Sequence, residues 1–192
     1  MDNFLFLGEH SVTDFINTEL KPSGKLIDLL QTHTDVKGWF KEAGLISNVD
    51  KIHLDDSFFN ELIEYRNLIK KSFFEYLDDK KNLDTLIKKT NEILKQNEVF
   101  LQISSIDTEY VQTFKPNKKN ANIFLTTIAI ELTKLLSSKE FKYLKRCNNH
   151  ECVLVFIDTS KNHSRRWCSM EMCGNRSKVN SFNKRNKTKK VD

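Results

Sequence analysis

The sequence predicts a mostly α protein, in which a helical N-terminal domain with one small β-hairpin precedes a compact C-terminal unit that holds every cysteine. Apolar residues recur at helical spacing in five segments, which indicates amphipathic helices. All four cysteines lie within 27 residues near the C-terminal end. The chain of 192 residues has only 2 Pro and 5 Gly, whereas all-β and disordered chains use many such residues.

Start and stop signals accompany the helical segments. Thr13 or Ser11 is the expected N-cap of the first helix, and Ser57 that of the longest one. Gly44 follows the second helix, where a glycine commonly ends a helix. The predicted helices span residues 14–20, 34–43, 57–77, 84–95 and 120–136.

The apolar period changes to two between residues 100 and 114. Apolar and polar side chains alternate on both sides of Asp107-Thr108, which predicts a β-hairpin. A helical pattern then returns and ends near residue 137. We therefore expect one domain over residues 1–138 and a second over residues 139–192.

The spacing of the cysteines is typical of a metal site. Four residues separate Cys147 from Cys152, four separate Cys168 from Cys173, and fifteen lie between the pairs. A segment of this size buries too little apolar surface to fold unaided, and one Zn²⁺ supplies about 10 kcal/mol of apparent binding energy. Four thiolates complete a tetrahedral Zn²⁺ site and leave no position for a reactive water, which makes the site structural.

Three alternatives compete with zinc on four cysteines. Two disulfides would form in an oxidising compartment, and an iron–sulfur cluster also takes four cysteines. His150 or His163 would replace one ligand in a site of three cysteines and one histidine.

The residues around the cysteines predict a small fold. The apolar run 153–157 is typical of a strand, and Trp167 is expected in the core of the module. Val179 and Phe182 are spaced to share one helix face after Cys173. A knuckle, a hairpin and a helix that begins near the last ligand resemble a treble clef.

Several short motifs in this segment resemble motifs of the CGNR zinc finger family. They include Phe156-Ile157-Asp158-Thr159-Ser160, Arg165-Arg166-Trp167-Cys168-Ser169-Met170 and Cys173-Gly174-Asn175-Arg176. Near the N-terminus, Asp14-Phe15-Ile16-Asn17-Thr18 resembles the Asp-Phe-Val-Asn-Thr motif of the ABATE domain that usually accompanies this finger. The resemblance implies a stress-linked bacterial transcription regulator whose finger binds DNA.

Positive charge is concentrated at the C-terminal end. From Lys142 onward, Lys and Arg outnumber Asp and Glu by 13 to 4, whereas the rest of the chain has 18 against 22. Such an end is suited to a polyanion. The candidate nucleic-acid contacts are Arg165, Arg166, Asn175, Arg176, Lys178, Lys184 and Arg185.

Each of these assignments has a structural alternative. Arg165 and Arg166 are also placed to pair with Glu151 or Asp158, and the basic end is also typical of a solubilising tail. In the helical domain, Asn17 and Arg66 are the polar residues expected to contact a small-molecule effector if a cleft exists. A cap or hydrogen bond for Asn17, and an ion pair with Glu61 or Glu64 for Arg66, are the alternatives.

The function expected is DNA-binding transcription regulation, with the helical domain sensing a ligand or mediating homodimerisation. RNA binding, or protein interaction with a purely structural zinc, are the other candidates. The sequence has no Walker loop, no glycine-rich dinucleotide turn and no His-x-x-x-His pair, so no enzyme activity is expected. Without a basic, apolar leader or a run of about 20 apolar residues, the chain is expected in the cytoplasm and not in a membrane.

Overall fold

The computed structural model describes residues 4–106 and 109–179, which fall into two compact units. Residues 30–138 form the helical unit. The cysteine unit combines the described residues up to Leu29 with those from Lys139 onward. The expected boundary near residue 138 therefore coincides with one edge of the helical unit, but the first 29 residues group with the cysteines. The division into family domains 1–138 and 139–192 stays a prediction.

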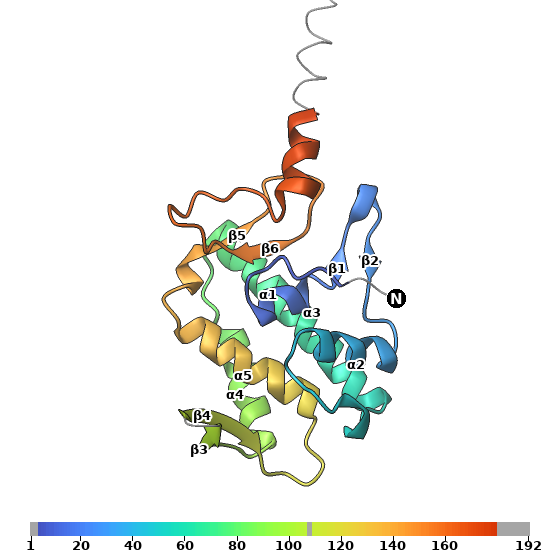
Figure 1. The fold of residues 1–192 in the computed structure, drawn as a ribbon, viewed down its shortest axis with the longest axis vertical. Helices are drawn as coiled ribbons and strands as arrows, with labels where there is room; N and C mark the ends of the chain where they lie inside the picture. Colours follow the sequence, from blue (N-terminus) through green and yellow to red (C-terminus); the bar gives the residue numbers. More distant parts are fainter. Residues whose placement is uncertain (1–3, 107–108, 180–192) are drawn as a thin grey trace, which may run out of the picture. The chain divides into compact units, whose positions relative to one another are not determined.

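The helical unit is built from four helices and the expected hairpin among its described residues (Figure 1). Helices α3, α4 and α5 contact one another, and a short 3₁₀ turn over Val49–Lys51 packs on α2. The elements are α2 (His33–Glu42), α3 (Asp56–Asp79), α4 (Asp84–Gln96), β3 (Val99–Ile106), β4 (Glu109–Pro116) and α5 (Ile123–Ser137).

Capping side chains fix where these helices begin. Thr32 and Asp35 form a reciprocal capping box on α2, and Gly44 follows that helix at φ 68°, as expected of a stop residue. The predicted cap of α3 was wrong, because Asp55 and not Ser57 accepts the hydrogen bond from the Phe58 N–H at 2.8 Å. That helix consequently starts at Asp56.

The core of the helical unit consists of apolar side chains from all four helices. The rings of Phe40 and Phe124 meet edge to face at 4.9 Å and join α2 to α5. Burial raises the pKa of Tyr65, whose hydroxyl shares a 2.8 Å hydrogen bond with Thr90 of α4. Other fully buried members are Leu62, Ile69, Phe73, Leu86 and Ile128.

Asn122 connects three elements of this unit. Its Oδ1 accepts the Leu125 N–H at 3.1 Å and so caps α5, while its Nδ2 donates to the Phe58 carbonyl of α3 at 3.1 Å. Its own N–H donates to Asn97 Oδ1 at the end of α4 at 3.1 Å. Because Asn122 is the cap, α5 begins at Ile123, three residues later than predicted.

The hairpin has the register that the alternation predicted. Strands β3 and β4 pair antiparallel from Val99–Pro116 to Ile106–Glu109. A 3.3 Å hydrogen bond from the Asn117 N–H to the Glu98 carbonyl continues the ladder beyond the strand ends.

The cysteine unit contains a short helix, two small sheets and a helical turn. The first helix begins at Ser11 and is capped by His10, so the predicted range 14–20 and both predicted caps were wrong. The elements are α1 (Ser11–Ile16), β1 (Glu19–Leu20) paired with β2 (Ile27–Asp28), β5 (Leu144–Arg146) paired with β6 (Val155–Ile157), and a π-helical turn over Met170–Gly174.

The chain is helical just after the last cysteine. Residues 175–179 are helical, which places a helix start beside the last cysteine as expected. Phe182 lies outside the described residues, and the treble-clef assignment stays a prediction. Among the helices described, none is long and apolar enough to cross a bilayer.

Replacing Asn122 with Ala should lower the free energy of unfolding of the helical unit by about 2 kcal/mol, because a helix cap and a buried inter-helix tie are lost together. Denaturant unfolding followed by circular dichroism measures the change. Exposed Asn120 supplies the matched control, and an equal loss in Asn120→Ala would contradict the role assigned to Asn122.

Candidate metal centre

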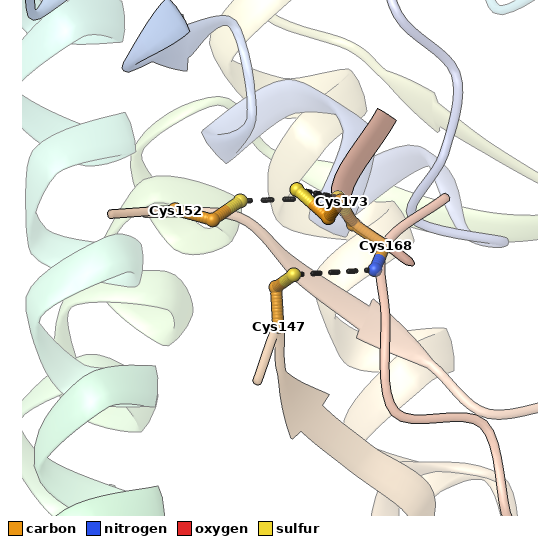
Figure 2. A group of neighbouring side chains, drawn as sticks. All are labelled: Cys147, Cys152, Cys168 and Cys173. Carbon is orange, nitrogen blue, oxygen red and sulfur yellow. Dashed lines mark hydrogen bonds between the residues drawn. The ribbon is translucent and has the colours of Figure 1, made fainter. Parts of the chain in front are cut away.

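Four sulfur atoms converge in the cysteine unit. The Sγ atoms of Cys147, Cys152, Cys168 and Cys173 all lie within 4.8 Å of one another, and Figure 2 shows the side chains pointing toward one another. The Cys152–Cys168 and Cys168–Cys173 Sγ separations are 3.8 Å and 3.6 Å. All four are free thiols, and Cys168 has no exposed surface.

These separations fit a tetrahedral zinc site. At a Zn–S bond length of about 2.3 Å, two ligands of a regular tetrahedron lie about 3.8 Å apart. The two separations above agree with that value, and the donor set of four thiolates is one that Zn²⁺ prefers. The four cysteines therefore form a zinc site whose coordination sphere they complete.

The thiols influence one another strongly. Hydrogen bonds from Cys152 and Cys168 lower the pKa of Cys147 to about 2. The same contact with Cys147 raises the pKa of Cys152 to about 12, and the pKa of Cys168 is also raised by its bonds to Cys147 and Cys152. Without a cation, the cluster thus favours the thiolate form of Cys147 and the protonated forms of Cys152 and Cys168, and binding of Zn²⁺ displaces the protons of these two thiols.

Local backbone geometry presents the two cysteine pairs to each other. Cys147 and Cys152 flank the turn between β5 and β6, where the Cys147 N–H donates to the Leu154 carbonyl at 3.0 Å. Cys173 lies in the π-helical turn, where its N–H donates to the Ser169 carbonyl at 3.0 Å. The Cys168 N–H points at the sulfur of Cys147 at 3.4 Å and links the pairs (Figure 2).

A buried carboxylate organises the loop between the pairs. Asp158 has no exposed surface, and it accepts hydrogen bonds from Lys145 Nζ at 2.7 Å and from the backbone N–H of Arg165 at 2.9 Å. Burial by itself raises the pKa of Asp158, but bonds from Lys145 and Ser160 outweigh burial and lower it to about 2. The carboxylate therefore stays ionised and holds the loop 158–165 in place.

The N-terminal segment is joined to this structure by a side-chain amide. Asn17 Nδ2 donates to the Val155 carbonyl at 2.8 Å, and Asn17 Oδ1 accepts the Val155 N–H at 3.0 Å. The amide thus pairs with β6 as a neighbouring strand would. Both of its polar groups are used within the fold, which agrees with the hydrogen-bond alternative for Asn17. The ligand contact of Asn17 stays a prediction.

Gly8 makes a second backbone connection to β6. Its carbonyl accepts the Ile157 N–H at 2.9 Å, and its N–H donates to Asp14 Oδ1 at 2.6 Å. A Cβ at Gly8 would lie 2.5 Å from Thr13 Oγ1, which explains a glycine here. Burial, together with the charge of Glu9 and against the hydrogen bond from Gly8, raises the pKa of Asp14 to about 6.

Arg165 fastens the N-terminal segment to the second cysteine pair. Its guanidinium lies 2.8 Å from Glu9 Oε1, donates to the Leu7 carbonyl at 3.0 Å and stacks 4.4 Å from the Phe156 ring centroid. The same group donates to the carbonyls of Trp167 and Cys168. These contacts give Arg165 a structural role, as its structural alternative expected, with Glu9 as the ion-pair partner of the guanidinium and Asp158 bonded only to the Arg165 backbone N–H. The phosphate contact of Arg165 stays a prediction.

An apolar cluster surrounds the sulfur atoms. Leu20 of β1, Leu154 next to β6 and Phe156 within β6 are buried with three of the cysteines. Leu5, Leu7 and Leu29 pack against this cluster, and so does Trp167, as expected of a core residue. The N-terminal residues thus supply part of the hydrophobic core of the metal centre.

The other predicted nucleic-acid contacts are exposed or partly exposed. Arg166 is exposed and lies 5.4 Å from the Trp167 ring centroid. Asn175 and Lys178 are exposed on the helical residues that follow Cys173, and Arg176 is partly buried there. Lys184 and Arg185 lie outside the described residues.

Neither histidine near the cysteines belongs to the sulfur cluster. His163 stacks on Tyr143 at 3.4 Å, and its Nδ1 lies 2.8 Å from the Asp158 carbonyl oxygen. The side chain of His150 is 79% exposed. Arg66 is buried in α3 of the helical unit, whereas Asn17 belongs to the cysteine unit.

Sequence reasoning missed the residues that attach the N-terminal segment. Glu9, Leu7 and Gly8 contact residues about 150 positions further along the chain, and no local pattern announces such pairs. The words Asp14-Phe15-Ile16-Asn17 and Phe156-Ile157-Asp158 were the available signal, because each contains a polar residue beside apolar ones.

Comparison with known proteins supports the metal centre. Residues 143–186 match the sequence model of the CGNR zinc finger family. All four cysteines fall within the matched segment. A comparison of the chain with curated proteins found no match.

The purified chain should contain one Zn²⁺ per molecule, and Cys168→Ser should lose it, because a neutral hydroxyl is a poor replacement for a buried thiolate. Metal analysis and the visible spectrum of the Co²⁺-substituted protein measure site occupancy and tetrahedral thiolate coordination. Exposed Ser164 provides the control variant Ser164→Ala. Full zinc content in Cys168→Ser would contradict the site.

Asn17→Ala should destabilise the cysteine unit by about 3 kcal/mol, because two buried backbone groups of Val155 lose their partners. The rate of zinc release to a chelator should rise in parallel. Asn148→Ala, at an exposed residue of the same unit, is the matched control. Equal release rates for Asn17→Ala and the unaltered protein would show that the N-terminal segment does not support the metal centre.

Proposed function

We propose that the zinc unit binds duplex DNA and that the protein regulates transcription. The observation that carries the proposal is the position of exposed or partly exposed positive charge beside the metal ligands. Arg166 lies two residues before Cys168, and Arg176 and Lys178 lie three and five residues after Cys173. Cations attached to a rigid scaffold meet phosphates without the entropy cost of ordering a free chain.

The local charge balance favours a polyanion. Among the described residues from Lys142 to Val179, eight are Lys or Arg and three are Asp or Glu. Asp158 is buried, which leaves Glu151 and Glu171 as the exposed acidic residues in this range. Lys184 and Arg185 add positive charge further along the sequence, and we propose that they also contact phosphates.

Asn175 gives the interface a group suited to reading bases. It is exposed at the start of the helical residues 175–179, and an asparagine amide pairs with the adenine edge in the major groove. The neighbouring cations would then contact phosphates on either side. A role in stress response, and an ABATE-like identity for residues 1–138, rest on the resemblance of the short sequence words and are part of the same proposal.

The helical unit offers a place for a small-molecule effector. A cavity of about 260 Å³ lies between α3, α4 and the start of α5, all within this unit. Its lining includes the charged side chains of Glu61, Glu64, Lys89 and Lys118 and the ring of Tyr65. A molecule that carries both a positive and a negative group, together with an apolar part, suits such a lining. Neither Asn17 nor Arg66 lines this cavity.

A catalytic role for the zinc is not part of the proposal. Metal-assisted hydrolysis needs an open coordination position for water, and four thiolates close the sphere. The ion therefore acts as a cross-link that positions side chains.

DNA binding should show a steep salt dependence, and Arg166→Ala should weaken it and reduce the slope of log K against log salt by about 1, because one phosphate contact is lost. Fluorescence anisotropy with duplex DNA at several salt concentrations measures both quantities. Zinc content and thermal stability should stay unchanged in Arg166→Ala.

The adjacent residue separates binding from folding. Arg165→Ala should lower the stability of the cysteine unit, because the Arg165 guanidinium joins Leu7 and Glu9 to the second cysteine pair.

Binding to single-stranded RNA in preference to the duplex would favour an RNA-binding role instead. Equal duplex affinity in Arg166→Ala and the unaltered protein, at every salt concentration, would contradict the proposed interface.

A further inference from the structure

No strand among the described residues pairs with the outer edge of β4. Hydrogen-bonded and non-bonded pairs alternate along an antiparallel ladder. The hydrogen bond from Asn117 to Glu98 shows which pairs are bonded, and counting along the ladder makes Ile106–Glu109 a bonded pair. The backbone N–H and C=O groups of Tyr110, Gln112 and Phe114 therefore point away from β3, toward the outer edge of the hairpin. No described residue hydrogen-bonds to the backbone of these three residues.

Several large apolar side chains on this hairpin are exposed. Tyr110 is 83% exposed, Ile103 78% and Leu101 56%. In the observed register, Leu101 lies opposite Phe114 and Ile103 opposite Gln112, so these residues share one face of the two-stranded sheet. A two-stranded sheet with an exposed apolar face and a free edge is a surface on which another strand can pair.

We infer that β4 pairs with β4 of a second copy of this chain, antiparallel and centred on Gln112, to form a four-stranded sheet across a two-fold axis. Such an interface is self-complementary, because each residue meets its symmetry partner. Centring the pair on Gln112 aligns all three outward-facing residues as hydrogen-bonded pairs, with Tyr110 opposite Phe114 of the second copy. The interface belongs to the helical unit and holds whether or not the zinc unit binds nucleic acid.

Charge complementarity selects this occupant and this register. With Gln112 at the centre, Glu109 of one copy lies opposite Lys115 of the other, and the same pair recurs at the other end of the strand. A shift of the register by two residues would break both pairs. Both side chains are exposed, and no described ion pair involves either one.

Apolar contacts reinforce the pairing. On the face that carries Tyr110, the partner strand extends the row Leu101–Phe114 by the tyrosine of the second copy, which gives an aromatic cross-strand pair. The other edge, β3, has no charged residue from Val99 to Ile106 and so nothing to fix a register with a second copy.

A charge-exchange experiment tests the pairing in the zinc-loaded full chain. Sedimentation equilibrium should show a concentration-dependent dimer. Glu109→Lys and Lys115→Glu should each raise the dimer Kd by about 5- to 30-fold, since each places like charges opposite at two positions. The double variant should restore the Kd to within about threefold of the unaltered chain. Lys119→Glu, at an exposed residue beyond the strand, should leave the Kd unchanged.

A cross-linking experiment tests the register. Two Gln112→Cys residues would lie about 5.5 Å apart between Cα atoms, within the range of a disulfide, and should give a covalent dimer on mild oxidation. Two Ile103→Cys residues would be about 14 Å apart, because two further strands lie between them, and should stay uncoupled.

Three results would overturn the inference. One is a chain that stays monomeric up to about 200 µM, a concentration at which even a weak specific dimer forms. Another is a double variant that dimerises as poorly as the single variants. The third is cross-linking through Ile103→Cys but not through Gln112→Cys, which would place the interface on β3.

Discussion

Four sulfur atoms sharing one zinc ion are the constraint on which the cysteine unit depends. Its described residues form short strands, a six-residue helix, a few helical turns and the helical residues 175–179, and elements this short are not stable alone. Thiolates repel one another, so the ion is needed to keep all four sulfur atoms ionised within 4.8 Å of one another. Once the ion fixes the two cysteine pairs, the loop between them is held by the ionised Asp158, and the side chains that flank the ligands acquire defined positions.

The metal centre also organises the beginning of the chain. Asn17 hydrogen-bonds to the Val155 backbone, and the Gly8 carbonyl accepts the Ile157 N–H. The Arg165 guanidinium donates to the Leu7 carbonyl and to the Glu9 carboxylate. The described part of the segment matched to the finger therefore shares hydrogen bonds and a hydrophobic core with the N-terminal residues. The polar residues of the Asp14-Phe15-Ile16-Asn17 word have structural explanations, since Asp14 accepts the Gly8 N–H and Asn17 completes the edge of β6. Arg165 and Arg166, although adjacent in sequence, separate into a residue that holds the fold and an exposed cation that is available to a partner.

Local patterns predicted the local elements well and the long-range ones poorly. Apolar periodicity located the helical segments and the hairpin, and cysteine spacing predicted the zinc ligands, because those signals lie within a few turns of chain. Helix starts shifted where the capping side chain was ambiguous, as at Asp55 beside Ser57 and at Asn122. The partners of Asn17 and of the Arg165 guanidinium were missed because they lie 138 and 156 residues away, and a single sequence contains no signal for such a pair.

The central claim is that zinc holds residues 4–29 and the cysteine segment as one folded unit. Amide hydrogen exchange, followed by mass spectrometry in the zinc-loaded and the chelated protein, tests it most directly. Peptides from both segments should lose protection together when zinc is removed, while those from α3 and α5 keep theirs. Unchanged protection of residues 4–29 after zinc removal, with exchange rising only around the cysteines, would contradict it.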